Sequence, residues 1–229
     1  MKRRRNSLRL NVFDYSQPAA YFVTLCTHDR MRVLGRVVNG RMILSETGKI
    51  VENVWKEIPD HFPTVQVEVF QIMPDHVHGI VEIRDLITQN KSNPVGVEYI
   101  QPRQRQKTKF QHITPNSLHS IIRSFKAAVT REAHRKVSLR WPGWQRSFYD
   151  RVIRDEVEHY FIRQYIELNP LMWEFGRKEP GLSPDELRSR LRKEHGLSGP
   201  EVERVMELRT QEIVRPPAET SSRDGFEPR

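Results

Sequence analysis

The sequence has a single cysteine, Cys26, among 229 residues, so no disulfide bond can form within the chain, which fits a reducing compartment. It also has no apolar run close to the roughly 20 residues that a membrane-spanning helix needs. Residues 1–6 are basic and lack the apolar stretch of a signal peptide. We therefore expect a soluble, cytoplasmic protein with no membrane partner.

Acidic residues are too few to balance the basic ones, and the net charge is +9. Residues 176–229 carry eleven Lys or Arg and eleven Asp or Glu, so the whole basic excess lies in residues 1–175. A basic surplus confined to one part of a chain favours a polyanionic partner, nucleic acid before anionic lipid. The alternative is a basic protein whose charge serves only solubility.

Two predicted strands, residues 65–72 and 76–83, are the stretch around which the rest of the chain is organised. The first is rich in β-branched residues, and Pro74 then interrupts the pattern because proline cannot donate to a β-ladder. Side chains alternate along a strand, so His76 and His78 share one face of the second strand. Two imidazoles on a rigid strand suit a divalent metal ion, and two incidental histidines on a solvated face are the alternative.

Other segments have equally clear local patterns. Residues 20–27 alternate as a strand that is partly buried on both faces, and the Asn39-Gly40 pair predicts a β-hairpin within residues 36–44. Ser45 can cap the helix that follows, which Pro59 is expected to end.

The segment 116–136 predicts an amphipathic helix with one apolar and one basic face. Its basic face and the basic loop before it, residues 84–115, are expected to follow the phosphates of a nucleic acid; a solvated, variable insertion is the alternative for the loop. Trp141 and Trp144 either stack on unpaired bases or pack in the core.

Asp155 is expected to begin another helix. Pro170 should end it at Asn169, because proline disfavours the helical conformation of the residue before it. Tyr165 and Asn169 are four residues apart and so share one face. For Tyr165 a core aromatic is the alternative, and two other tyrosines, Tyr149 and Tyr160, compete for any chemical role.

In their order along the chain, these motifs resemble the REP-associated tyrosine transposases, part of the HUH superfamily of single-strand DNA nickases and transposases. The matching stretches are YFVTL (21–25), MPDHVHGI (73–80), SFK (124–126), WQR (144–146), YDRVIR (149–154) and YIELNP (165–170). The His-Val-His motif alone is weakly specific, whereas its combination with a later Tyr-x-x-x-Asn-Pro is strongly specific. Arg151 stands where many relatives have histidine.

The resemblance implies a ferredoxin-like α+β domain in residues 1–175, an antiparallel sheet with helices packed on one face. Residues 176–229 lie outside the resemblance, and their own pattern predicts an accessory helical hairpin followed by a disordered tail. The resemblance further implies that His76, His78 and Asn169 bind Mg²⁺ or Mn²⁺. Tyr165 would be the nucleophile that forms a 5′-phosphotyrosine intermediate.

The partner that the resemblance implies is single-stranded or hairpin DNA, with a homodimer implied by the family alone. The residues expected to contact DNA are Arg103, Arg105, Lys107, Arg123, Lys126, Arg131, Trp144, Arg146, Arg151 and Arg154. A non-catalytic binder of hairpin DNA or RNA is the alternative. A structural zinc site is disfavoured, because one cysteine and two histidines do not complete four ligands.

Overall fold

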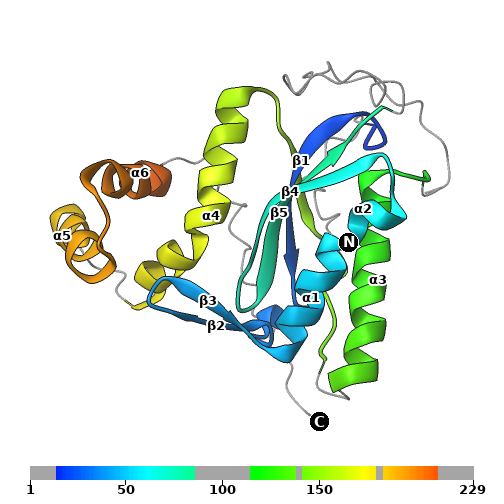
Figure 1. The fold of residues 1–229 in the computed structure, drawn as a ribbon, viewed down its shortest axis with the longest axis horizontal. Helices are drawn as coiled ribbons and strands as arrows, with labels where there is room; N and C mark the ends of the chain where they lie inside the picture. The colour runs from blue at the N-terminus through cyan, green and yellow to red at the C-terminus, as the bar shows by residue number, and fades with distance from the viewer. Residues whose placement is uncertain (1–13, 86–113, 138–140, 179–182, 211–229) are drawn as a thin grey trace, which may run out of the picture.

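The computed structural model describes residues 14–85, 114–137, 141–178 and 183–210 (Figure 1). The elements in chain order are β1 (Ala19–Cys26), η1 (His28–Arg30), β2 (Gly35–Val38), β3 (Arg41–Leu44), α1 (Glu46–Lys56), α2 (Ile58–His61), β4 (Val65–Ile72), β5 (His76–Ile83), α3 (Leu118–Val137), β6 (Tyr149–Val152), α4 (Glu156–Lys178), α5 (Pro184–His195) and α6 (Gly199–Thr210). The basic loop with Arg103, Arg105 and Lys107 and the expected disordered tail lie outside the described residues.

The central sheet has four strands in the order β4-β5-β1-β6, and all of its neighbouring strands are antiparallel. Helix α1 lies between β1 and β4 in the chain, and α3 lies between β5 and β6. This βαββαβ sequence with that strand order is the ferredoxin-like arrangement. The predicted fold class is therefore confirmed, with β2 and β3 added as a separate hairpin.

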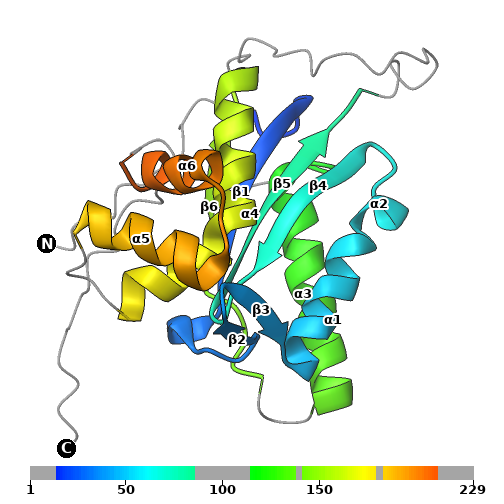
Figure 2. The same cartoon turned by 60° about the vertical axis from the view of Figure 1, so that its left-hand side comes forward.

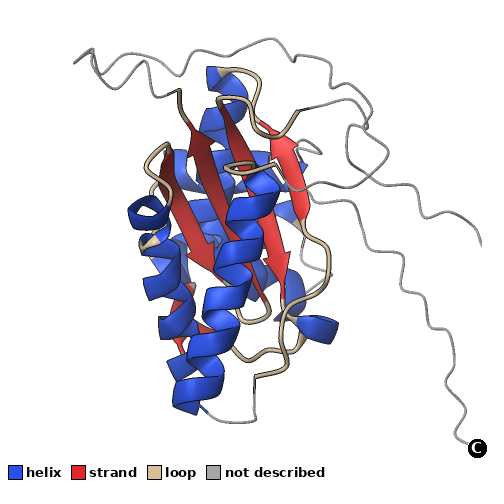
Figure 3. Cartoon of the chain, turned by 90° about the vertical axis from the view of Figure 1, so that its right-hand side faces the viewer, coloured by secondary structure: helices blue, strands red, loops and turns tan. Residues whose placement is uncertain are grey.

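Helices cover both faces of the sheet (Figure 3). Alternate residues of β1 and β5 that include Val23 and Val81 pack with α1 and α3 in the larger core. The residues between them, which include Phe22 and Ile80, pack against Ile162 of α4 on the opposite face. The prediction that the helices share one face holds for α1 and α3 and is wrong for α4. Both faces of β1 are apolar because both are covered.

The predicted hairpin and helix cap are present. Asn39 and Gly40 both have positive φ, 51° and 69°, as a type I′ turn between β2 and β3 requires. The Ser45 hydroxyl accepts a hydrogen bond from the Gly48 amide at 3.1 Å and so caps α1. The prediction that Pro59 ends this helix is wrong, because α1 already ends at Lys56. Pro59 lies in the first turn of α2, where a backbone N–H has no acceptor within the helix and proline is therefore tolerated.

Helix α4 continues through Pro170 to Lys178, so the prediction that it ends at Asn169 is wrong. A proline inside a helix removes one backbone hydrogen bond and bends the axis, and α4 does not run straight (Figure 2). Residues beyond the proline compensate for this loss by burial: Leu171 and Phe175 pack into a small core with α5 and α6. Asn169 therefore lies inside a continuous helix.

The helical hairpin expected after residue 176 is present as α5 and α6. Ser183 and Glu186 form a complete capping box at the start of α5, and Gly196 ends that helix with a positive φ of 65°. The hairpin packs on the second half of α4, and Leu208 of α6 reaches the core between α4 and the sheet. None of the described helices is both long and apolar enough to cross a membrane.

Candidate active site

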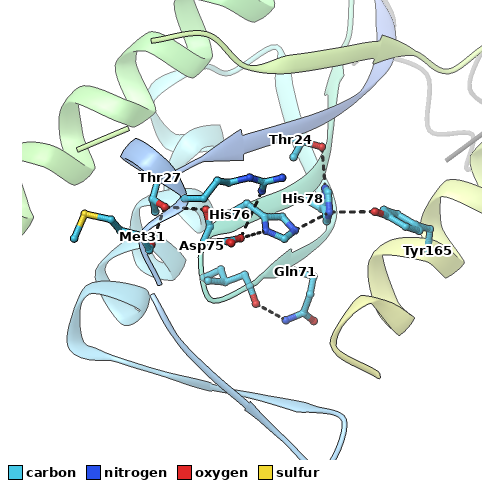
Figure 4. A network of polar contacts seen from close by, with 10 residues as sticks. Thr24, Thr27, Met31, Gln71, Asp75, His76, His78 and Tyr165 are labelled. Atoms are coloured by element: carbon cyan, nitrogen blue, oxygen red, sulfur yellow. Dashed lines mark hydrogen bonds and ion pairs between the residues drawn. The ribbon is translucent and has the colours of Figure 1, made fainter. Parts of the chain in front are cut away.

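The two histidines of β5 converge on the face of the sheet that α4 covers (Figure 4). The Nε2 atoms of His76 and His78 are 3.0 Å apart. Both side chains are buried, with 6% and 1% of their surface exposed. The prediction that they share a face is therefore confirmed, and they do not lie on a solvated surface.

A partner on Nδ1 orients each imidazole. The Asp75 carboxylate lies 2.5 Å from His76 Nδ1, and because an ionised carboxylate can only accept, His76 Nδ1 donates. The Thr24 hydroxyl lies 2.9 Å from His78 Nδ1, across the pairing of β1 with β5. Both rings are thus held so that Nε2 points at the other ring, the arrangement typical of histidines that bind a metal ion.

The electrostatics of the pair favour a neutral imidazole at His78. Burial lowers the pKa of His78 well below its ordinary value, and the charges of His76 and Arg30 lower it further. Arg30 lies 3.5 Å from the Asp75 carboxylate, whose side chain is only 2% exposed. A neutral imidazole keeps a lone pair that can bind a cation.

Helix α4 brings Tyr165 to the histidines: its hydroxyl is 3.5 Å from His78 Nε2. The Trp173 ring, two helical turns later, lies 5.6 Å from the His76 ring between centroids. Asn169 is midway between them on the same helix face, and it is 6% exposed. From this spacing we expect Asn169 to lie on the side of α4 that faces the histidine pair.

The donor set fits a divalent cation. The two Nε2 atoms are 3.0 Å apart, so both imidazoles could bind the same divalent ion. Among the described residues, no cluster of three His, Cys, Asp or Glu could hold a metal ion. A third ligand from the described residues would therefore have to be of another kind, such as the side-chain amide of Asn169.

The basic face of α3 is not brought to the histidines, because α3 packs on the other face of the sheet from α4. Arg123 and Arg131 are exposed there. Lys126 donates to the backbone carbonyls of Gln145 and Ser147, at 2.9 and 3.0 Å, and so holds the segment before β6 in place.

Two further arginines predicted to contact DNA are paired with a buried carboxylate. Arg151 Nε is 2.5 Å from one oxygen of Glu158, and Arg154 Nε is 3.2 Å from the other. Arg154 keeps 70% of its side chain exposed, whereas Arg151 keeps 23%. Arg154 is therefore the more accessible of the two to a phosphate.

The tryptophan segment before β6 runs beside the end of β1, where Gln145 donates to the carbonyl of Cys26. Trp141 is 6% exposed and donates to the Thr130 hydroxyl, so packing rather than base stacking accounts for it. Trp144 is half-buried against Trp141, at 5.2 Å between ring centroids. Arg146 is exposed.

Several residues of the site were not expected from the sequence: Thr24, Asp75, Arg30 and Trp173. Asp75 precedes His76 directly and follows Pro74, a position typical of a turn residue. Trp173 lies eight residues after Tyr165, a spacing that puts both residues on one face of a continuous helix. This spacing would have indicated Trp173 as a site residue if the helix had been expected to continue past Pro170. The contact of Thr24 with His78 depends on the register in which β1 pairs with β5, because the two residues are 54 positions apart in the chain.

The fold and site define an α+β protein with a paired-histidine centre and a tyrosine beside it. No protein-family model matches the chain. An uncharacterised protein of Haemophilus influenzae is 36% identical over 170 residues, which cover 74% of this chain and 90% of that protein. The chain belongs to the same family as that protein, whose name states no activity.

A second protein of Haemophilus influenzae, named "Putative REP-associated tyrosine transposase", is 23% identical over 159 residues, or 69% of this chain and 73% of that protein. The resemblance to REP-associated tyrosine transposases is thereby confirmed. A solved REP-associated tyrosine transposase bound to a REP hairpin is 14% identical, with a TM-score of 0.45, over 76% of this chain and 74% of that one. A structural likeness at this level says nothing about activity.

Proposed function

We propose that this protein is a transposase that cuts and rejoins single-stranded DNA at hairpin-forming, REP-like sequences. The observation that carries the proposal is the approach of the Tyr165 hydroxyl to within 3.5 Å of His78 Nε2. The Tyr165 ring packs in the core against Phe22, and its hydroxyl at the end of the ring points at His78 (Figure 4). The name of the relative that is 23% identical supports the same class of protein.

In the proposed reaction the Tyr165 oxygen attacks a phosphorus atom of the DNA strand. A bond forms between tyrosine and the 5′ phosphate while the bond from phosphorus to the 3′ oxygen breaks. The phenol gives up its proton, and the departing 3′ oxygen takes one up. Attack by a 3′-hydroxyl on the phosphotyrosine reverses the exchange, so no nucleotide cofactor is consumed.

The histidine pair would hold the cofactor of this reaction. Mg²⁺ or Mn²⁺ bound by His76, His78 and the amide oxygen of Asn169 would offset the charge of the phosphate and make phosphorus more electrophilic. Such help is needed, because a phenol with a pKa near 10 is almost entirely protonated at neutral pH. Asp75 and Thr24 would keep both imidazoles in the binding orientation.

The test uses single-stranded hairpins of varied flanking sequence, labelled at the 3′ end because the tyrosine keeps the 5′ phosphate. With Mn²⁺, the wild-type protein should give a labelled covalent band on a denaturing gel, and chelation should remove it. Tyr165→Phe should lose the band and keep hairpin binding. Tyr160→Phe is the matched control, since Tyr160 lies on the same helix and is 47% exposed.

Two outcomes would contradict the proposal in different ways. A covalent adduct formed by Tyr165→Phe would show that another residue is the nucleophile. Hairpin binding by the wild-type protein without an adduct, whichever metal ion is added, would show the non-catalytic binder instead.

A further inference from the structure

Two arginines, Arg30 and Arg32, lie in the loop after β1, and of these only Arg30 forms an ion pair with an acid among the described residues. Arg30 pairs with the buried Asp75 carboxylate at 3.5 Å. Arg32 is exposed and makes no ion pair with any described residue. Its guanidinium carbon lies 5.9 Å from the centroid of the Trp173 ring. Within the part of the chain that the structure describes, the charge of Arg32 is therefore not matched by an acid.

Trp173 connects Arg32 to the site. The same indole ring that faces Arg32 lies 5.6 Å from the His76 ring, with 43° between the two ring planes. The Trp173 ring therefore contacts both the Arg32 guanidinium and the ring of His76, one of the two proposed metal ligands on β5. A guanidinium stacked on an aromatic face keeps its N–H groups directed outward at the edge.

The loop that carries Arg32 is fixed to the strand that carries the histidines. The Thr27 hydroxyl is within hydrogen-bond distance of the carbonyls of Asp75 and Met31, at 2.9 and 2.8 Å. Further along, Leu34 donates to the carbonyl of Pro74 at 3.0 Å. Both ends of the loop are therefore held at the two residues that directly precede His76.

The backbone of the loop is also in an unusual conformation. Asp29 and Arg30 have consecutive positive φ angles of 50° and 54°, although neither is glycine. Such residues persist where the surrounding structure determines them, and they gather at functional sites. This strained turn ends two residues before Arg32, whose guanidinium lies over the Trp173 ring of α4.

We propose that Arg32 binds a phosphate of the DNA strand beside the one that the histidine centre would hold, and that Trp173 positions its guanidinium. A planar guanidinium with outward N–H groups is the side chain best suited to a phosphodiester. This proposal rests on the function proposed above and adds a strand-binding residue that lies outside the basic helix face and loop. It places the strand between the β1–β2 loop and α4.

The first experiment measures binding of fluorescent oligo(dT) to the full chain by anisotropy at several NaCl concentrations, without divalent metal. Each phosphate contact contributes about 0.7 to the slope of log affinity against log salt for single strands. Arg32→Gln should reduce the magnitude of that slope by about 0.7, and Arg32→Lys should leave it unchanged. Arg36→Gln is the matched control, because Arg36 is an exposed arginine four residues later.

The second experiment needs no variant. Modification of the wild-type protein with phenylglyoxal, followed by peptide mass spectrometry, should show Arg32 protected by oligo(dT) and Arg36 not protected. If Arg32→Gln keeps the wild-type slope and Arg32 is modified equally with and without DNA, the Arg32 proposal is wrong. If the Arg32 proposal fails while the wild-type protein still nicks hairpins, the proposed function stands. If the wild-type protein binds no DNA at all, both the Arg32 proposal and the proposed function fail.

Discussion

Replacing Asp75 by Asn tests the histidine pair most directly. The Asp75 carboxylate accepts from His76 Nδ1 at 2.5 Å, and both side chains are less than a tenth exposed, so solvent screens the contact little. The substitution keeps the shape and removes the charge that orients His76 and strengthens it as a ligand. Loss of such a partner weakens metal binding about 10- to 100-fold, or about 1.4 to 2.7 kcal/mol.

The assay is titration with Mn²⁺, with the unbound ion followed by electron paramagnetic resonance. Thr24→Val removes a bond from a neutral hydroxyl and should weaken binding less than Asp75→Asn, because bonds to charged groups are stronger. Asp60→Asn in α2 is the control at an exposed position. An unchanged Mn²⁺ affinity in Asp75→Asn would refute the orienting role, and a wild-type protein that binds no Mn²⁺ would refute the metal site.

Two further predictions concern stability. Gly79→Ala should lower the free energy of unfolding by about 1–3 kcal/mol, because a Cβ there would overlap the buried Trp55 indole. Gly199→Ala is the control, because a Cβ at Gly199 meets open space and should not lower that free energy. Equal denaturation midpoints for Gly79→Ala and wild type would contradict this prediction. Glu68 hydrogen-bonds His159 at 2.9 Å, which raises the pKa of His159 and lowers that of Glu68. The stabilisation is complete between the ordinary values of about 4.5 and 6.5 and fades as pH rises through the His159 pKa. The difference in melting temperature between wild type and Glu68→Gln should therefore be larger at pH 5.5 than at pH 8.5, and a difference independent of pH would contradict the pairing.

Local patterns predicted most elements of this fold. The alternation on either side of Pro74 gave β4 and β5 with their residue bounds, and it put His76 and His78 on one face. The Asn39-Gly40 turn and the Ser45 cap followed from conformational and hydrogen-bonding preferences of single residues. Such features depend on neighbours in the chain, so the sequence contains what is needed to find them.

Helix α4 shows where local rules fail. Pro170 disfavours a helix at Asn169, yet the helix continues because Leu171 and Phe175 gain burial against α5 and α6. Burial of apolar surface by residues distant in the chain can outweigh a local preference. The same distant packing put α4 on the face of the sheet opposite to α1 and α3.

The sequence by itself determined that two imidazoles share a strand face and that Tyr165 and Asn169 share a helix face. Only the tertiary structure decided that these two faces meet and that the Thr24 hydroxyl lies at His78 Nδ1. The reason is physical: the first set follows from the period of one element, whereas the second depends on strand register and helix docking. Those are fixed by contacts between segments far apart in the chain.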